Sequence, residues 1–367
     1  MSVFLVDLEA VETRYTAQWK IHVPKLLEEN GNISGYKGLG NQTAKVYHDV
    51  TVIDGPTDIP SATTPGAFLN FGGTNVYKAC QVETIGRLFC DGRVSPGDHF
   101  IFTDAWHPGI INLKYMSELL GIPVKIHALW HAGSYDPQDF LGRLIGDADW
   151  VRHAEKSFFY AIDYNYFATD FHIDMFCFNL FKCPRWMFKD RIVRTGWPME
   201  YMQDLLEPYK NLPKRDLILF PHRIAPEKQV EIFRDLAVSL PDYEFIVCQD
   251  QQLTKDQYHT LLGESKIVFS ANLQETLGIS CYEGCLVGAV PMVPDRLSYK
   301  EMYTDAFRYP SEWTESWDSY LTHKQSLIDI IVWSIENYES RIKLVKTNAA
   351  SLTDNFFSAT NLIKNIQ

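Results

Sequence analysis

Two series of short apolar runs, each alternating with helical segments, constrain the fold of this chain more than any other feature. In the first series, apolar runs lie at 3–8, 46–53, 99–103 and 123–130, and a helical segment at 110–120 separates the last two. A strand, a helix and a strand at this spacing are typical of a parallel sheet whose helices cover its faces. The pattern therefore predicts an α/β fold.

The second series begins after a stretch that has the proline and polar content of a linker, LLEPYKNLPKR at 204–214. Its apolar runs lie at 216–220, 243–248, 266–269 and 289–293, with helical segments at 227–240, 254–262 and 279–288. Helical segments also cover roughly 318–346 and 351–366. A chain of 367 residues is long enough for two domains. We expect a doubly wound, Rossmann-like domain at 1–203, a second at 215–345, and a C-terminal helix at 346–367 that packs back toward the first. Two such domains in tandem bind a ligand in the cleft that their strand ends face.

The composition narrows the class of protein. Hydrophobic residues make up 46% and charged residues 22%, a globular balance. No apolar run is long enough to span a membrane, and the N-terminus does not resemble a signal peptide. Seven cysteines form no Cys-x-x-Cys pair, which favours a reducing cytoplasm, that of the host if the chain is viral. The net charge of −12 argues against binding nucleic acid through charge alone, although an enzyme with a local basic groove stays open.

The segment FPHRIAPEKQ at 220–229 places two basic side chains after an expected strand. The planar guanidinium of Arg223 can donate hydrogen bonds to two phosphate oxygens at once, and the ammonium group of Lys228 adds a mobile positive charge. A helix expected to begin near Pro226 adds the partial positive charge of its N-terminus. This corner suits a diphosphate. A solvated basic turn is the alternative.

The segment SANLQETLGISCYEG at 270–284 contains two glutamates with seven residues between them. Glu275 lies in an expected loop and Glu283 on the helix that follows. Peptide N–H groups at this helix start favour an anion, and a glycine permits close approach of the backbone; the residues concerned are Thr276, Leu277 and Gly278. Two carboxylates in these positions can bind the hydroxyl groups of a sugar and of a ribose that are linked through a diphosphate. The alternative is a capping acid and an unrelated surface glutamate.

Together these segments resemble the retaining, family-4-like glycosyltransferases of the GT-B fold. That family has an Arg and a Lys after the first strand of its second domain, then Glu-x7-Glu and a Gly-x-x-Pro continuation. The chain matches with Arg223, Lys228, Glu275, Glu283 and the run from Gly288 to Pro291. The match covers about 216–294, and the rest is similar at the level of the fold.

The resemblance implies a nucleotide-sugar donor, with a UDP-sugar expected, and no tightly bound cofactor. Arg223 and Lys228 would hold the diphosphate, Glu275 the transferred sugar, and Glu283 the ribose. The backbone of 276–278 would cradle the distal phosphate. His131, in LWHAGSYDP, stands where the family has a histidine that faces the sugar; a loop histidine without a role is the alternative. The departing phosphate itself would take the acceptor proton, and no metal would be needed.

The region of the sequence that is expected to bind the acceptor departs from the pattern of the family. Its Gly-Gly loop is replaced by DLEAVETRY, where Glu9, Thr13 and Arg14 could serve an unusual acceptor. His107 and Asp104 follow another expected strand and could also contact the acceptor. The segment that would bind the base is short, around 247–252, and does not identify the nucleotide. The Asp-Ala-Asp at 147–149 superficially matches a metal motif, but lies between helical segments and is interpreted as a helix-cap feature.

One segment suggests a kind of acceptor. KCPRWMFKDRIVR at 182–194 mixes basic and aromatic residues, which can track a phosphate backbone and stack on bases; the candidates are Arg185, Trp186, Lys189 and Arg191. The stretch 216–315 also resembles glycosyltransferases of tailed bacteriophages, some of which modify hydroxylated pyrimidines in DNA. We therefore expect a hydroxylated or hydroxymethylated pyrimidine in phage DNA as acceptor, presented as an extruded base. A structural strand edge is the alternative for 182–194.

Two alternatives stay open for the function of the protein as a whole. One is a transferase acting on a polysaccharide or lipid-linked saccharide, and the other is a non-catalytic binding protein.

Overall fold

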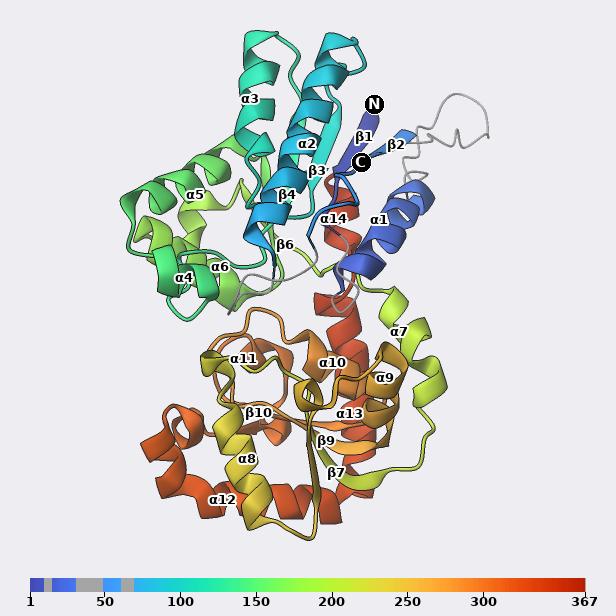
Figure 1. The fold of residues 1–367 in the computed structure, drawn as a ribbon, viewed down its shortest axis with the longest axis vertical. Coiled ribbons are helices and arrows are strands. Elements are labelled where there is room, and N and C mark those ends of the chain that lie inside the picture. Colours follow the sequence, from blue (N-terminus) through green and yellow to red (C-terminus); the bar gives the residue numbers. More distant parts are fainter. Residues whose placement is uncertain (10–14, 31–48, 61–68, 367) are drawn as a thin grey trace. The chain divides into compact units, whose positions relative to one another are not determined.

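The computed structural model describes residues 1–9, 15–30, 49–60 and 69–366 (Figure 1). They form two compact units. The first contains Met1–Ala168, Ile173–Met199 and Ala359–Gln367, and the second contains Thr169–His172 and Glu200–Ser358. None of the helices in these described ranges is both long and apolar enough to cross a membrane.

The first unit is built on a parallel sheet with the strand order β2-β1-β3-β4-β5-β6. Its centre is apolar: Phe100, Phe102 and Ile126 are fully or almost fully buried, because strands of a parallel sheet are covered on both faces. Figure 1 shows α2 and α3 running side by side on this unit. The strands are β1 (Ser2–Val6), β2 (Asp49–Ile53), β3 (His99–Phe102), β4 (Lys125–Leu129), β5 (Tyr164–Phe167) and β6 (Ile192–Arg194). The helices are α1 (Thr16–Asn30), α2 (Phe71–Cys90), α3 (Gly109–Leu119), α4 (Phe140–Ile145), α5 (Asp149–Ala161), α6 (Asp170–Phe176), whose first residues belong to the second unit, and α14 (Thr360–Lys364).

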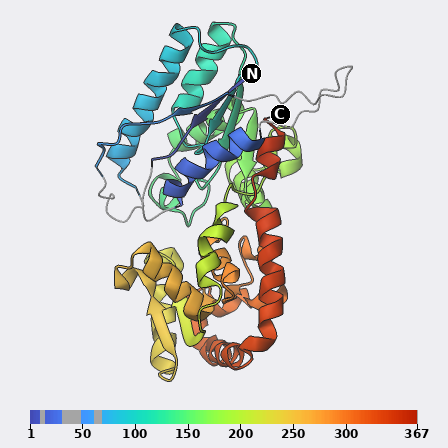
Figure 2. The ribbon, with the colours of Figure 1, turned by 90° about the vertical axis from the view of Figure 1, so that its right-hand side faces the viewer.

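The second unit has a parallel sheet in the order β11-β10-β9-β7-β8. Its strands are β7 (Arg215–Phe220), β8 (Glu244–Val247), β9 (Ser265–Phe269), β10 (Val290–Pro294) and β11 (Arg308–Tyr309). Its helices are α7 (Tyr201–Leu206), α8 (Val230–Ser239), α9 (Lys255–Glu264), α10 (Ile279–Leu286), α11 (Tyr299–Met302), α12 (Trp317–Glu336) and α13 (Tyr338–Phe356). The long α13 is the most extended red helix in Figure 2. The predicted α/β fold with two parallel sheets is confirmed.

Several local predictions need correction. The pattern gave no helix over 70–90, where α2 lies; glycines at 72, 73 and 86 obscure it, but the Asn70 side chain caps its start by accepting a hydrogen bond from the N–H of Gly73 at 2.8 Å. The aromatic stretch near 164 contains β5. The helical segment at 318–346 is divided between α12 and α13, with a break at Asn337.

The turn after β7 also differs from the prediction. The helix expected near Pro226 begins at Val230 as α8, and Pro226–Lys228 form a short 3-10 helix before it. Gln229 separates the two because its φ of +52° is left-handed. Lys228 therefore does not lie on a regular helix. The stretch expected as a linker contains the end of α7 and a 3-10 turn, Glu207–Tyr209.

Candidate active site

The strand order of the second sheet reverses at β7, which has β8 on one side and β9 on the other. Ligands of parallel α/β sheets bind outside the carboxyl ends of the strands at such a point. The loop after β7 carries Arg223 and Lys228, and the loop after β9 carries Glu275 and the backbone of 276–278. The structure thus brings most of the predicted donor residues to one edge of one sheet.

Lys228 and Glu275 contact each other at the centre of this site. Lys228 is 6% exposed. Its Nζ donates a hydrogen bond to the carbonyl of Gln274 at 2.6 Å and lies 3.4 Å from Oε2 of Glu275. The Nδ2 of Asn272 donates to the same carboxylate oxygen at 3.2 Å. The long Lys228–Glu275 contact leaves both charged groups able to take shorter partners from a ligand.

The electrostatics of the site keep Glu275 ionised. Burial alone would raise the pKa of this carboxyl, but the positive charge of Lys228 and the hydrogen bonds from the N–H groups of Gly278 and Leu277 hold the pKa below its usual value. Burial, with Lys228 nearby, lowers the pKa of His222 to about 3, so its ring is neutral at pH 7. This histidine is not among the residues predicted from the sequence. Its place two residues after a buried strand was the available signal.

The residues of the predicted backbone cradle lie directly before α10. The N–H of Leu277 lies 3.5 Å from Oε1 of Glu275, and α10 begins at Ile279. Gly278 has a φ of +69°, and a Cβ at this position would lie only 2.8 Å from the ring of Tyr299. Both the conformation and the space require glycine here.

Arg223 precedes Lys228 in the same loop but has a different partner. Its Nη2 forms an ion pair with Oε1 of Glu227, whose side chain is fully buried. The Arg223 side chain is 32% exposed, so it is reachable from solvent. The two predicted cations are therefore each paired with a separate glutamate.

Glu283 lies on α10 and is held by a residue that the sequence analysis did not name. The hydroxyl of Tyr258, on α9, donates a hydrogen bond to Oε2 of Glu283 at 2.7 Å. Burial raises the pKa of Glu283 to about 7, and the Tyr258 bond opposes this shift. Glu283 does not contact the Lys228–Glu275 pair directly. The connection runs through α10, which carries both Glu283 and Ser280. The Ser280 hydroxyl lies 3.3 Å from Nδ1 of His222.

Two further residues hold the loop that ends in Glu275. The guanidinium of Arg296 donates to the carbonyls of Asn272 at 2.8 Å and Ala271 at 2.8 Å, and also to Thr314 and Ser311. The Nε2 of Gln229 donates to the carbonyls of Ala271 and Thr314 at 2.6 and 2.7 Å. These bonds fix the loop after β9. No pattern in the sequence indicates them, because all of the acceptors except the Thr314 hydroxyl are backbone carbonyl groups.

In the first unit, the strand order reverses between β1 and β3. Asp7 and Glu9 follow β1, and both are at least nine-tenths buried. Oδ1 of Asp7 accepts a hydrogen bond from the Tyr77 hydroxyl at 2.8 Å, and burial raises the pKa of Asp7 to about 7. Arg14 and Thr13, the other candidates of this loop, lie outside the described residues.

His131 follows β4 and is enclosed by aromatic rings. Its Nδ1 lies 2.7 Å from the Tyr15 hydroxyl, and its Nε2 lies 2.5 Å from the carbonyl oxygen of Thr103. A carbonyl only accepts, so Nε2 carries the proton and Nδ1 accepts one from Tyr15. The Trp197 ring lies 4.3 Å away, centroid to centroid. A hydrogen bond from His131 to a sugar would have to replace one of these two contacts.

His107 and Asp104 differ in exposure and in partners. His107 is 2% exposed, its Nε2 lies 2.9 Å from Oε1 of Gln81, and its Nδ1 accepts from the N–H of Gly109. Its contacts are those of a buried structural histidine and not of an acceptor ligand. Asp104 is paired with Lys78 at 2.8 Å. Burial alone would raise the pKa of Asp104, but the charge of Lys78 and its hydrogen bond to this carboxylate lower the pKa to about 2.

The segment 182–194 is only partly available for binding. Arg191 donates to the carbonyls of Tyr160 and Ile162 at 3.1 and 3.2 Å, so its guanidinium secures the end of α5. Arg185 lies 3.4 Å from Asp174. Trp186 is 69% exposed, and Lys189 is exposed too.

Asp147 and Asp149 lie at the start of α5 and are exposed, between two helices as expected. Neither side chain caps the helix, however; the N-cap residue is Ala148. Across the described ranges, no group of three or more His, Cys, Asp or Glu side chains is placed to hold a metal ion.

Two parallel α/β units in succession define the GT-B fold, and solved structures with this architecture are similar to the chain. HepE from Anabaena, in complex with UDP, has a TM-score of 0.56 and 10% identity, over 100% of this chain and 98% of HepE. The N-terminal domain of Candida albicans trehalose-6-phosphate phosphatase has a TM-score of 0.59 and 11% identity, over 99% and 96%.

The pneumococcal O-GlcNAc transferase GtfA, solved with UDP and GlcNAc, has a TM-score of 0.51 and 12% identity. The match covers 79% of this chain and 59% of GtfA, so the chain spans little more than half the length of that protein. No protein-family model matches the sequence. No curated protein matches it either. Identities near 10% establish the fold alone, and a fold hosts more than one activity.

Proposed function

We propose that the protein transfers a sugar from a UDP-sugar to an acceptor hydroxyl and that the second unit binds the donor. The observation that carries this proposal is the Lys228–Glu275 pair beside the Gly278 turn, at the reversal of strand order. This arrangement supplies a cation, an ionised carboxylate and the peptide N–H groups of Leu277 and Gly278 within one loop cluster. A diphosphate with a hydroxylated sugar needs these groups.

In this proposal each of the four charged residues predicted for the donor has one task. Lys228 and Arg223 neutralise the diphosphate, whose negative charge increases as the sugar leaves. Glu275 accepts hydrogen bonds from sugar hydroxyls, and Glu283 accepts them from the ribose. The cations and the start of α10 stabilise the leaving group without a metal ion, and the departing phosphate takes the acceptor proton on the same face, which retains the anomeric configuration. The solved complexes of HepE with UDP and with UDP-glucose support a UDP-sugar as donor.

The donor site is tested by Lys228→Ala and Glu275→Gln, assayed with a panel of UDP-sugars in the presence of EDTA. We expect wild-type transfer to persist and each variant to raise the barrier by about 2–4 kcal/mol, since a charge-assisted contact to the transition state is lost. Lys266→Ala removes a lysine that pairs with Asp216 in the same unit and serves as control. A folded Lys228→Ala protein with wild-type turnover would overturn the assignment. Loss of wild-type transfer in EDTA, restored by Mg²⁺, would overturn metal independence.

For the acceptor, we propose a hydroxylated or hydroxymethylated pyrimidine in DNA, as in the phage enzymes that the sequence resembles. The proposal rests on the basic and aromatic pattern of 182–194 and on the exposure of Trp186, on which a base can stack. Because Arg191 is used internally, we expect Arg185→Glu, Trp186→Ala and Lys189→Glu together to reduce transfer to DNA at least tenfold. Donor hydrolysis should be unchanged. Equal transfer by this variant across a salt series would contradict the DNA groove, and transfer only to saccharides would favour a polysaccharide or lipid-linked acceptor.

A further inference from the structure

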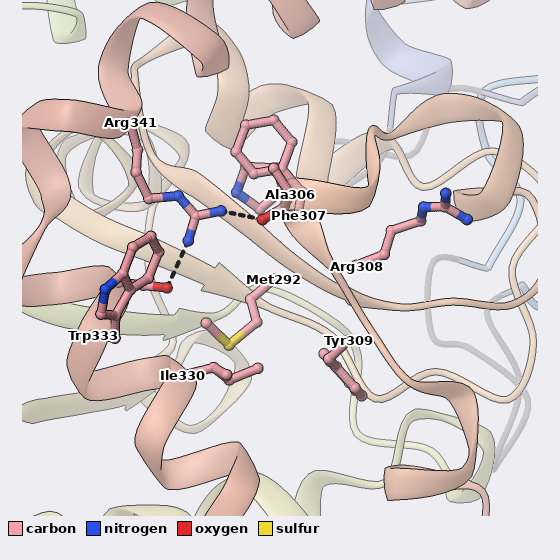
Figure 3. A pocket seen from close by; sticks show the side chains of 10 residues that line it. Met292, Ala306, Phe307, Arg308, Tyr309, Ile330, Trp333 and Arg341 are labelled. Carbon is pink, nitrogen blue, oxygen red and sulfur yellow. Dashed lines mark hydrogen bonds between the residues drawn. The ribbon is translucent and has the colours of Figure 1, made fainter.

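The corner between α12 and α13 holds a cavity of about 110 Å³ beside a buried arginine (Figure 3). Its walls come from β10, from residues 306–309, from the second half of α12 and from the first turn of α13. None of the residues predicted to bind the donor or acceptor lines it. Trp333 is 53% exposed, so this side of the cavity lies next to solvent.

Arg341 contributes an uncompensated positive charge to this cavity. It is 8% exposed. Its Nη1 donates to Oγ of Ser334 at 2.7 Å, and its Nη2 donates to the carbonyl of Ala306. Among the residues that the structure describes, no carboxylate forms an ion pair with Arg341, and burial alone lowers its pKa. A guanidinium has five N–H groups, so three are left for other acceptors.

The surroundings of Arg341 restrict how an acceptor can approach. The guanidinium carbon lies 5.2 Å from the centroid of the Phe307 ring and 5.4 Å from that of Trp333. The guanidinium lies over both rings, so a further acceptor reaches it from a side that the rings leave open, where two carboxylate oxygens can pair with two of its N–H groups. Arg308 also lines the cavity, but in Figure 3 its side chain points away from the other labelled side chains. It pairs with Asp295 and Asp305 and adds no free charge.

We propose that this cavity binds a short aliphatic monocarboxylate, with its carboxylate on Arg341 and its alkyl body against Met292 and Ile330. One guanidinium balances one negative charge, whereas a phosphate dianion would bury a second charge without a partner. The apolar walls favour an apolar body. Since a cavity of about 150 Å³ accommodates benzene, one of about 110 Å³ fits a molecule close to propionate in size.

Methyl NMR of the full chain, labelled at the methionine methyl groups, tests this site because the Met292 methyl lines the cavity. Met292→Leu assigns the signal. We expect propionate to shift it saturably at millimolar concentration, while propionamide, which has the same shape without the charge, leaves it unchanged at the same concentrations. Propionate should also raise the melting temperature of the wild-type protein more than equimolar chloride does.

Arg341→Gln should abolish the shift, and Lys343→Gln, which changes an exposed lysine of α13 that does not line the cavity, should keep it. If Arg341→Gln does not fold, the comparison of propionate with propionamide on the wild-type protein tests whether the cavity binds the carboxylate. A Met292 shift that grows linearly without saturation, or that is equal for both compounds, would overturn the proposal. A saturable response to inorganic phosphate and not to propionate would overturn the choice of ligand class.

Discussion

At the scale of single residues, the candidate donor site depends on backbone conformations that few side chains adopt easily. Gly278 has a φ of +69° directly before α10, and Gln229 has a φ of +52° directly before α8. Gln229 tolerates this conformation because its side chain bonds to the carbonyls of Ala271 and Thr314. Gly278 has no side chain to compensate, and the Tyr299 ring occupies the space beside it. The turn is therefore specific for glycine.

Gly278→Ala should destabilise the protein by about 1–2 kcal/mol for the left-handed conformation alone, and further because its Cβ would meet the Tyr299 ring. We also expect weaker binding of UDP, since the N–H groups of this turn would be displaced. Gly86→Ala is the matched control: it lies inside α2 with no atom within 4 Å of the added Cβ, so it should stabilise by about 0.5–1 kcal/mol. Denaturant unfolding and UDP calorimetry measure both effects. Equal stability of the two variants would contradict this account of the turn.

At the scale of elements, the loop after β9 is held by residues from other elements. Arg296, which follows β10, donates to the carbonyls of Ala271 and Asn272, and it also bonds to residues 311 and 314, which come after β11. A single guanidinium thus connects the loops that follow three strands. The position of Glu275 depends on this connection because it lies three residues beyond Asn272.

We expect Arg296→Lys to weaken UDP-sugar binding more than its loss of stability explains. An ammonium is a point charge and cannot span the same set of carbonyls; each buried bond lost costs about 1–3 kcal/mol. Arg341→Lys is the control, since Arg341 also bonds to a carbonyl in the same unit but does not contact the loop. Thermal unfolding and calorimetry with UDP-glucose separate the two quantities. If both variants bind UDP-glucose equally at matched stability, Arg296 does not position the site.

At the scale of the whole molecule, buried acids in both units link stability to pH. Burial raises the pKa of Asp7, in the first unit, and of Glu283, in the second, to about 7 each, from ordinary values of 3.8 and 4.5. Both carboxyls are therefore protonated in the folded chain at pH values where the unfolded chain has lost the proton. In that range the folded state binds more protons, so stability decreases as pH rises.

The free energy of unfolding should accordingly fall between about pH 4 and pH 7 through these two groups and level off above. One unit of pKa difference corresponds to about 1.4 kcal/mol. Asp7→Asn and Glu283→Gln should each flatten the curve, whereas Asp149→Asn, an exposed acid at the start of α5, should not. Urea unfolding at a series of pH values measures the slopes. A wild-type curve that rises over this interval while both variants follow it unchanged would contradict the assignment.

The position of the candidate donor site could be predicted because its residues follow strand ends. Apolar runs of four to six residues mark the strands, and in a parallel sheet their carboxyl ends share one edge. The spacing of Lys228, Glu275 and Gly278 relative to those runs was therefore enough to place them at one edge. The helix α2 and the strand β5 escaped prediction because glycines and aromatic residues hide their periodicity.

The sequence by itself determined the fold class, the succession of most strands and helices, and the positions of the charged residues in the loops. Only the tertiary structure decided which of these residues are used internally. His107 and Arg191 match a binding pattern in the sequence, yet Gln81 and the carbonyls at the end of α5 occupy them. Arg296 matches no pattern, yet it holds the loop of Glu275. The reason is physical: local spacing sets which edge of a sheet a residue reaches, whereas burial and hydrogen-bond partners come from residues far away in the chain.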